Sequence, residues 1–67
     1  MRLGNFLNDY IDFKSLSIIV ADAQTGNIQF GGTVKQFQDS RYYDKLEGLW
    51  VDSLDVDNNK LVIYISY

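Results

Sequence analysis

The 67-residue chain contains no cysteine, no histidine and no proline. Without cysteine it forms no disulfide, and without cysteine and histidine it lacks the ligands of the common zinc sites. It also lacks the nucleophile–histidine pairs of many hydrolases, so we expect neither an enzyme nor a cofactor. A single domain of this size, residues 1–67, buries only about 60% of the surface that its unfolded chain exposes. Its stability therefore has to come from a well-packed core or from self-association.

Long apolar runs and clusters of positive charge are missing as well. No run approaches the roughly 18 residues that span a bilayer, and the start of the chain lacks the apolar core of a signal peptide. We therefore expect a cytoplasmic protein without a membrane partner. Six Lys and Arg against nine Asp and Glu give a net charge of −3. This charge disfavours direct binding to nucleic acid, even though Tyr64 and Tyr67 have rings that can stack on bases.

The clearest structural pattern lies between residues 49 and 65. Two runs rich in β-branched and aromatic side chains flank the tetrapeptide 57–60, and its Asp and Asn residues tolerate the positive φ of a tight turn. The pattern predicts a β-hairpin. It also fixes the register of the two strands, because a slip by one residue would turn the apolar face to water. The predicted register pairs Val56 with Leu61, Leu54 with Ile63 and Asp52 with Ile65.

The same turn has a partial likeness to a calcium loop. Asp55, Asp57 and Asn59 place oxygen atoms at positions 1, 3 and 5 of such a loop. However, Lys60 stands at position 6, where the loop needs glycine, and Ser66 stands at position 12, where it needs a bidentate glutamate. We interpret the segment as a polar hairpin turn and expect no metal site.

The first half of the chain predicts a helix followed by a second hairpin. The run 16–21 is apolar on both faces, as expected of a central strand, and 27–31 would be the returning strand. If Asp22 pairs with Asn27, the neighbouring pairs are Ala21 with Ile28 and Ile19 with Phe30. One stripe of a short amphipathic helix, which would cover a face of the sheet, is formed by Leu3, Phe6, Leu7, Tyr10 and Ile11.

A second helical segment follows the glycine pair at 31–32. Thr33 and Gln36 have the spacing of a capping box, so a helix beginning at Val34 would turn Val34 and Phe37 inward. We predict an interruption near residues 39–40 and a further turn that runs to residue 47 and stops at Gly48. The order helix, hairpin, helix, hairpin gives an α+β fold with an antiparallel sheet of about four strands.

Acidic and aromatic side chains are concentrated between residues 39 and 57. Six carboxylates stand there against only two cations, Arg41 and Lys45. Aromatic anchors among negative charges suit a basic protein groove, including one that normally holds nucleic acid. The alternative is a solvated region whose acidity only keeps the protein soluble. We predict that a protein partner binds the acidic–aromatic surface, which consists of Tyr42, Tyr43, Asp44, Glu47, Trp50 and Asp52.

The last strand is a candidate for self-association. Neither proline nor lysine interrupts residues 61–67, so an edge strand here could pair with another strand. Val62, Tyr64 and Tyr67 would then form a homodimer contact. The alternative is that this strand is central and already covered.

Several segments together resemble small acidic proteins of phages, prophages and mobile elements of Gram-positive bacteria. They are Leu3-Gly4-Asn5-Phe6-Leu7, Ile18-Ile19-Val20, Asp22, Gly26-Asn27, Phe30-Gly31-Gly32-Thr33-Val34, Val51-Asp52-Ser53-Leu54 and Leu61-Val62-Ile63. Such proteins include inhibitors of host defence nucleases, among them anti-CRISPR proteins, which occupy nucleic-acid channels. The resemblance implies a phage or mobile-element setting and not an activity, and it carries over no site residue. Together with the acidic–aromatic surface, that setting gives our leading hypothesis, a module that binds or inhibits a basic host protein such as a defence nuclease. The alternative function is a structural, self-assembling homo-oligomer.

Overall fold

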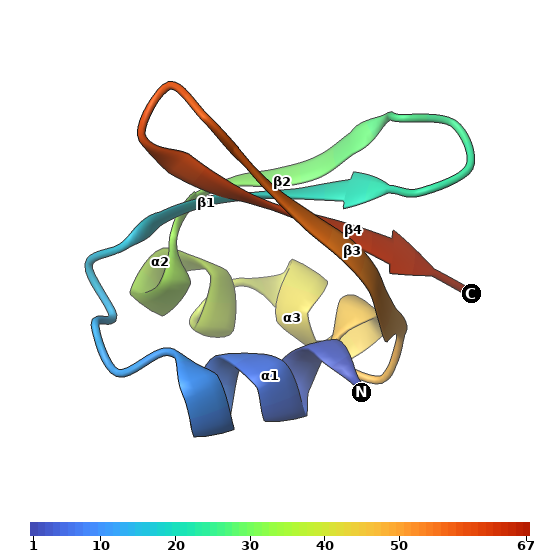
Figure 1. The fold of residues 1–67 in the computed structure, drawn as a ribbon. Helices are drawn as coiled ribbons and strands as arrows, with labels where there is room; N and C mark the ends of the chain where they lie inside the picture. Colours follow the sequence, from blue (N-terminus) through green and yellow to red (C-terminus); the bar gives the residue numbers. More distant parts are fainter.

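Three short helices cover one face of a four-stranded sheet in the computed structural model, which describes residues 1–67 (Figure 1). This is the α+β fold that the sequence predicts. None of the helices is long and apolar enough to cross a membrane. The elements in chain order are α1 (Leu3–Tyr10), β1 (Ser17–Asp22), β2 (Ile28–Thr33), α2 (Val34–Gln38), α3 (Arg41–Leu46), β3 (Trp50–Asp57) and β4 (Lys60–Ser66).

The sheet is mixed, because its two antiparallel hairpins join through parallel strands. The strand order is β2-β1-β4-β3, and β1 runs parallel to β4 with Ile18 opposite Leu61 and Val20 opposite Ile63. The prediction of a purely antiparallel sheet is therefore wrong at its centre. Of the two alternatives for the last strand, the central position is the correct one, since β4 pairs with β1 on one side and with β3 on the other. Its run of apolar residues on both faces, 61–65, is typical of such a central strand.

The β3–β4 hairpin confirms most of the predicted register. Val56 lies opposite Leu61, and the turn residues Asn58 and Asn59 have φ angles of 51° and 63°. The pairing of Asp52 with Ile65 is wrong, because the register shifts between residues 51 and 53 and places Val51 opposite Ile65. A bulge adds one residue to a strand, and here it turns apolar Val51 toward the core instead of Asp52.

The β1–β2 hairpin contains a second bulge. The Asp22 N–H donates to the Asn27 carbonyl at 2.9 Å, and Ala21 lies opposite residue 28, as predicted. The pairing of Ile19 with Phe30 is wrong, because the register shifts between residues 20 and 21 and places Phe30 opposite Val20. Phe30 therefore faces the helices, where its ring lies 5.0 Å from that of Phe37.

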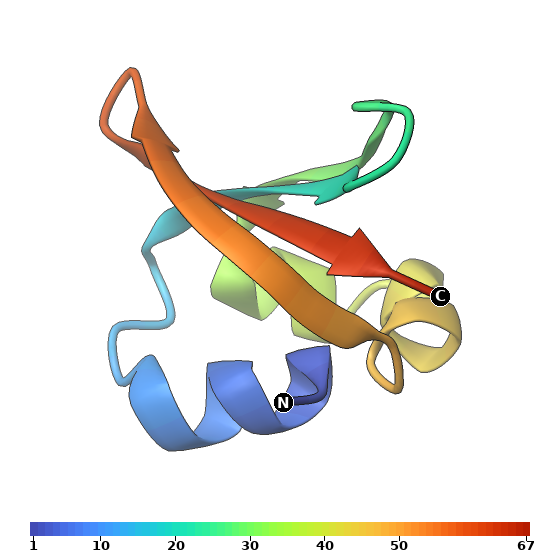
Figure 2. The same ribbon diagram turned by 45° about the vertical axis from the view of Figure 1, so that its right-hand side comes forward.

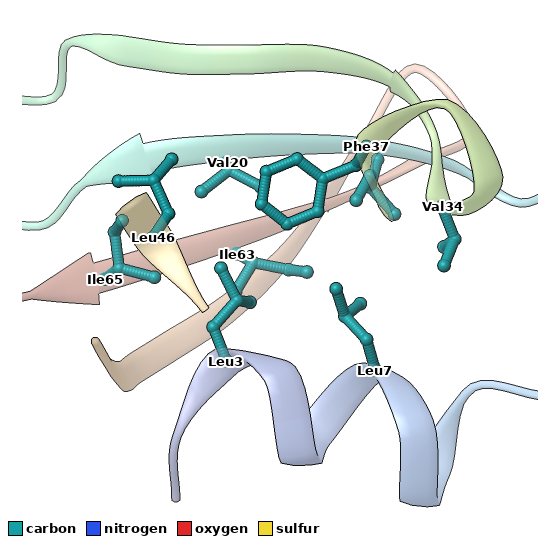
Figure 3. Close-up of a cluster of buried hydrophobic side chains, with 9 residues drawn as sticks. Leu3, Leu7, Val20, Val34, Phe37, Leu46, Ile63 and Ile65 are labelled. Atoms are coloured by element: carbon teal, nitrogen blue, oxygen red, sulfur yellow. The ribbon is translucent and has the colours of Figure 1, made fainter. Parts of the chain in front are cut away.

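The core fills the space between the helices and the sheet (Figure 3). Of the stripe predicted for α1, Leu3 and Leu7 are buried, and Phe6 and Ile11 pack against the core, although Ile11 lies just beyond the helix end. Only Tyr10, which is 63% exposed, departs from the prediction. The predicted capping box at Thr33 and Gln36 is present, with both of its hydrogen bonds. The nine side chains of the core cluster are Leu3, Leu7, Ile18, Val20, Val34, Phe37, Leu46, Ile63 and Ile65.

The two helical segments after β2 are separate helices, as predicted. Ser40 precedes α3, and its hydroxyl donates to the Phe37 carbonyl at 2.7 Å, so it closes α2 without capping α3. Helix α3 packs against the start of α1, where the Gly4 N–H donates to the Glu47 carbonyl at 2.8 Å. A Cβ atom on Gly4 would lie 3.2 Å from both the Glu47 Cβ and the Tyr43 hydroxyl oxygen, so the close approach of these helices depends on this glycine.

Candidate binding surfaces

The face of the sheet opposite the helices is uncovered (Figures 1 and 2). We call it the open face. Its centre follows from the parallel register of β1 and β4, which places Ile19 beside Val62 and Ala21 beside Tyr64. Because side chains alternate along a strand, these four residues point away from the core that their neighbours form. The open face is therefore apolar along its two central strands.

A shallow hollow of about 290 Å³ lies on this face, and we call it the sheet groove. Its floor is Ile19, Ala21, Val62 and Tyr64, and Gly26 and Ile28 of the first hairpin line it together with Asp55, Val56 and Asp57 of the second. The twist of the sheet explains the hollow, because it lifts the turns of the two hairpins at opposite corners (Figure 2).

The apolar lining of the groove is unevenly exposed. Val62 is 7% exposed, since its neighbours on the sheet shield it, whereas Ile28 is 66% exposed. A ligand in the groove would thus gain apolar contact at the Ile28 end, at Val56, which is 71% exposed, and along the partly exposed Ile19 and Tyr64 side chains. An apolar hollow with a few polar groups at its rim is the usual form of a binding site.

The opposite end of the groove is acidic. Asp55 and Asp57 are exposed, and neither forms an ion pair, since the single ion pair of the protein joins Lys35 to Asp39 at 3.2 Å. Lys60 lies across the ladder from Asp57 without forming an ion pair with it. The Asp55 carboxylate accepts a hydrogen bond from the Val56 N–H at 2.8 Å. Two carboxylates against one lysine leave this end with a net negative charge.

The acidic–aromatic surface predicted from the sequence spans α3 and the start of β3. Of its three aromatic residues, Tyr43 is partly buried, and its ring packs edge-on against Phe37 at 5.5 Å. Burial raises the pKa of the Tyr43 hydroxyl, and the Glu47 carboxylate raises it further. Tyr43 thus belongs as much to the packing of α3 as to a surface.

Cations also cover the other two aromatic rings of the acidic–aromatic surface. The Arg2 guanidinium lies over the ring of Trp50, 4.7 Å from its centroid, and the Arg41 guanidinium lies over that of Tyr42 at 5.5 Å. Arg2 also donates to the Gly48 carbonyl. With Lys45 on α3, three cations accompany the three carboxylates Asp44, Glu47 and Asp52. The surface is therefore close to neutral, and its role as a binding site stays a prediction.

The residues predicted for self-association are separated in the structure. Val62 and Tyr64 lie in the floor of the sheet groove, whereas Tyr67 follows β4 and is 75% exposed. Sequence reasoning missed the contribution of Ile19, Ala21 and Ile28 to the same hollow. The available signal was the run 16–21, whose two apolar faces require cover on both sides.

No group of three or more Asp and Glu side chains is placed to hold a metal ion. The chain was also compared with known proteins. No family model, curated protein or solved structure matches it. A functional assignment therefore has to rest on the surfaces described above.

Proposed function

We propose that this protein is a non-catalytic binding module whose sheet groove holds a basic segment of a partner protein. One observation carries the proposal: the helices leave an apolar hollow uncovered, and two unpaired carboxylates, Asp55 and Asp57, lie in its wall. An aliphatic side chain would bury apolar area on the floor, while a lysine or arginine could reach the carboxylates.

The charge of the whole molecule supports the same class of partner. A net charge of −3 on a chain of this size attracts basic proteins and repels acidic ones. A basic host protein such as a defence nuclease, the partner that we hypothesise from the sequence, belongs to this class. The proposal keeps that partner and places the contact in the sheet groove, because cations already accompany the carboxylates of the acidic–aromatic surface.

A titration with simple peptides tests the proposal. We expect a synthetic peptide of alternating lysine and leucine to bind with a dissociation constant of about 1 mM or tighter and to shift the amide NMR signals of Ile19, Ala21, Val62 and Tyr64. A glutamate–leucine peptide should not bind, and added salt should weaken the complex because exposed charges are screened. Affinity that is independent of salt, or no saturable binding, would contradict the proposal.

Charge reversal at two places locates the contact. The double substitution Asp55→Lys with Asp57→Lys should weaken peptide binding about tenfold or more, since two surface charge pairs become repulsive. Asp44→Lys with Glu47→Lys is the matched control, because it changes the net charge equally but lies on α3 and at its end. The proposal expects the smaller loss in the control. The reverse order would assign binding to the acidic–aromatic surface.

A further inference from the structure

The two edge strands of the sheet, β3 and β2, are protected very differently. The start of β3 already pairs with the first residues of the chain, since the Val51 N–H donates to the Met1 carbonyl at 2.8 Å. β3 carries Asp52, Asp55 and Asp57 and contains a bulge, and such features discourage pairing with another strand. The Val56 N–H also donates a hydrogen bond to the Asp55 carboxylate at 2.8 Å, so this N–H is not free to pair with another strand. β3 is therefore a blocked edge.

β2 at the other edge has none of these charges. Residues 23–34 contain no charged side chain, and no other stretch of the chain without charge is as long. The strand is also firmly supported, because the Phe30 ring lies 5.0 Å from that of Phe37 and 6.3 Å from that of Tyr42. In Figure 3, β2 is the outermost strand, at the top of the view. β2 is thus an open edge that is held in an extended conformation.

The register shows which backbone groups this edge presents. The Val34 N–H donates to the Leu16 carbonyl at 3.0 Å, so Ser17 and Thr33 form a pair without hydrogen bonds between them. The same holds for the pair two residues along, Ile19 and Gly31. The N–H and C=O groups of Thr33 and Gly31 therefore point away from β1. The Thr33 N–H is occupied by the Gln36 side-chain oxygen at 2.9 Å. Gly31 is exposed, and its outward amide remains free to pair.

Gly31 also leaves room for an approaching strand. A Cβ atom built on this residue would meet nothing within 4 Å. The space beside this residue is therefore open. Because side chains stand roughly perpendicular to a sheet, even a small side chain here would leave its N–H and C=O groups accessible to another backbone. The open edge has a donor and an acceptor on the same residue, so it is complementary to itself.

We propose that two copies of the chain pair through β2 in antiparallel orientation, with Gly31 of each copy opposite the other. A two-fold axis at this point makes both Gly31 amides donate and both carbonyls accept, which is the self-complementary contact of a symmetric dimer. Copies with a net charge of −3 repel each other, and the uncharged segment 23–34 is where that repulsion is weakest. A second copy is therefore the occupant that this edge fits.

The dimer has a consequence for the sheet groove. A two-fold axis between antiparallel strands stands perpendicular to the sheet, so the two halves join into one sheet with all helices on one side and both grooves on the other. A partner with two basic segments could then bind both grooves and gain affinity from the second contact. The dimer itself does not require the groove to bind anything, and it can be tested without a ligand.

The solution mass tests the dimer. Pairing over about five residues of each strand is a small interface, so we expect a reversible dimer with a dissociation constant of about 10–1000 μM. Sedimentation equilibrium of the full chain alone should show the mass rising between about 10 μM and 2 mM. Gly31→Pro should raise the dissociation constant about tenfold or more, because two N–H donors per dimer are lost. Gly31→Ala keeps the donor and should dimerise like the wild type.

Hydrogen exchange on the wild type gives an answer even if Gly31→Pro does not fold. The Gly31 amide should exchange more slowly as the protein concentration rises. The Leu54 amide, which alternation along the ladder from Val56 places on the blocked edge, should not change. A chain that stays monomeric up to 2 mM would overturn the proposal, and so would a dimer that folded Gly31→Pro leaves intact or a Gly31 amide whose exchange is independent of concentration.

Discussion

The Tyr43 side chain connects packing with ionisation. Its ring packs against Phe37, and its hydroxyl lies near Gly4 and Glu47, where burial and the carboxylate raise its pKa above the ordinary value of 10.0. Below pH 10 the hydroxyl is neutral in both the folded and the unfolded chain. Above pH 10 the unfolded chain ionises first and binds fewer protons, so the contribution of Tyr43 to stability is lost as the pH rises through its folded pKa.

We therefore expect the difference in free energy of unfolding between the wild type and Tyr43→Phe to depend on pH. The variant should be less stable at neutral pH, because it loses the contacts of the hydroxyl. That difference should shrink between about pH 9 and pH 12, since only the wild type has a Tyr43 to ionise. Urea denaturation at several pH values measures it. A difference that stays constant up to the alkaline end would contradict the structure.

Gly32 makes a second prediction for a single residue. Its φ is 154°, and a Cβ atom would lie 2.7 Å from the Gln36 side-chain oxygen, which belongs to the capping box of α2. Gly32→Ala should lower the free energy of unfolding by about 1–3 kcal/mol, from backbone strain and loss of that cap. Gly31→Ala is the matched control and should change it by less than about 0.5 kcal/mol. Urea denaturation of both variants measures the difference, at a protein concentration low enough to keep the chain monomeric.

Among the elements, the β3–β4 hairpin depends most on its turn. Asn58 and Asn59 both adopt a positive φ, and glycine reaches such angles without steric cost. We expect Asn59→Gly to raise the free energy of unfolding by less than about 1 kcal/mol, because relief of the positive φ is partly offset by the greater freedom of glycine in the unfolded chain. Asn59→Val should lower it by more than about 1 kcal/mol. Thermal or chemical denaturation measures the stability of both variants. If both were as stable as the wild type, the positive φ at this turn would not strain the chain.

Sequence patterns predicted those elements whose causes are local. The Val56–Leu61 pairing follows from the turn between them, and the start of α2 follows from the spacing of Thr33 and Gln36. Both bulges were missed. A bulge costs little free energy in the strand itself, so local sequence does not decide where it lies. Its position depends on which side chain packs best on the core, which is Phe30 in one hairpin and Val51 in the other.

The sheet groove was only partly predictable for a similar reason. Val62 and Tyr64 stood out within one apolar strand, but Ile19 and Asp55 reach the same hollow only because β1 and β4 join the two hairpins. No pattern of neighbouring residues encodes that junction. For the acidic–aromatic surface, the sequence overestimated the negative charge. Arg2 lies far from Trp50 in sequence, but its guanidinium lies over the Trp50 ring in the fold.

At the scale of the whole molecule, the asymmetry of the fold is the main functional clue. The helices bury one face of the sheet, and the other face keeps an apolar centre, an acidic corner and one uncharged edge. All three helices lie on the face of the sheet opposite the open face (Figure 1). Partner binding in the groove and pairing along β2 are two separate ways in which the open side of the sheet can be used.

The parallel pairing of β1 with β4 also constrains how the protein is made. The strands at the centre of the sheet come from opposite ends of the chain, so their contact closes a loop that contains most of the other elements. Local hairpins can form early, but this central contact is slow to find. During synthesis it has to wait until β4 has left the ribosomal exit tunnel, and until then β1 has only β2 as a partner strand, so its other edge and its apolar side chains are accessible to chaperones.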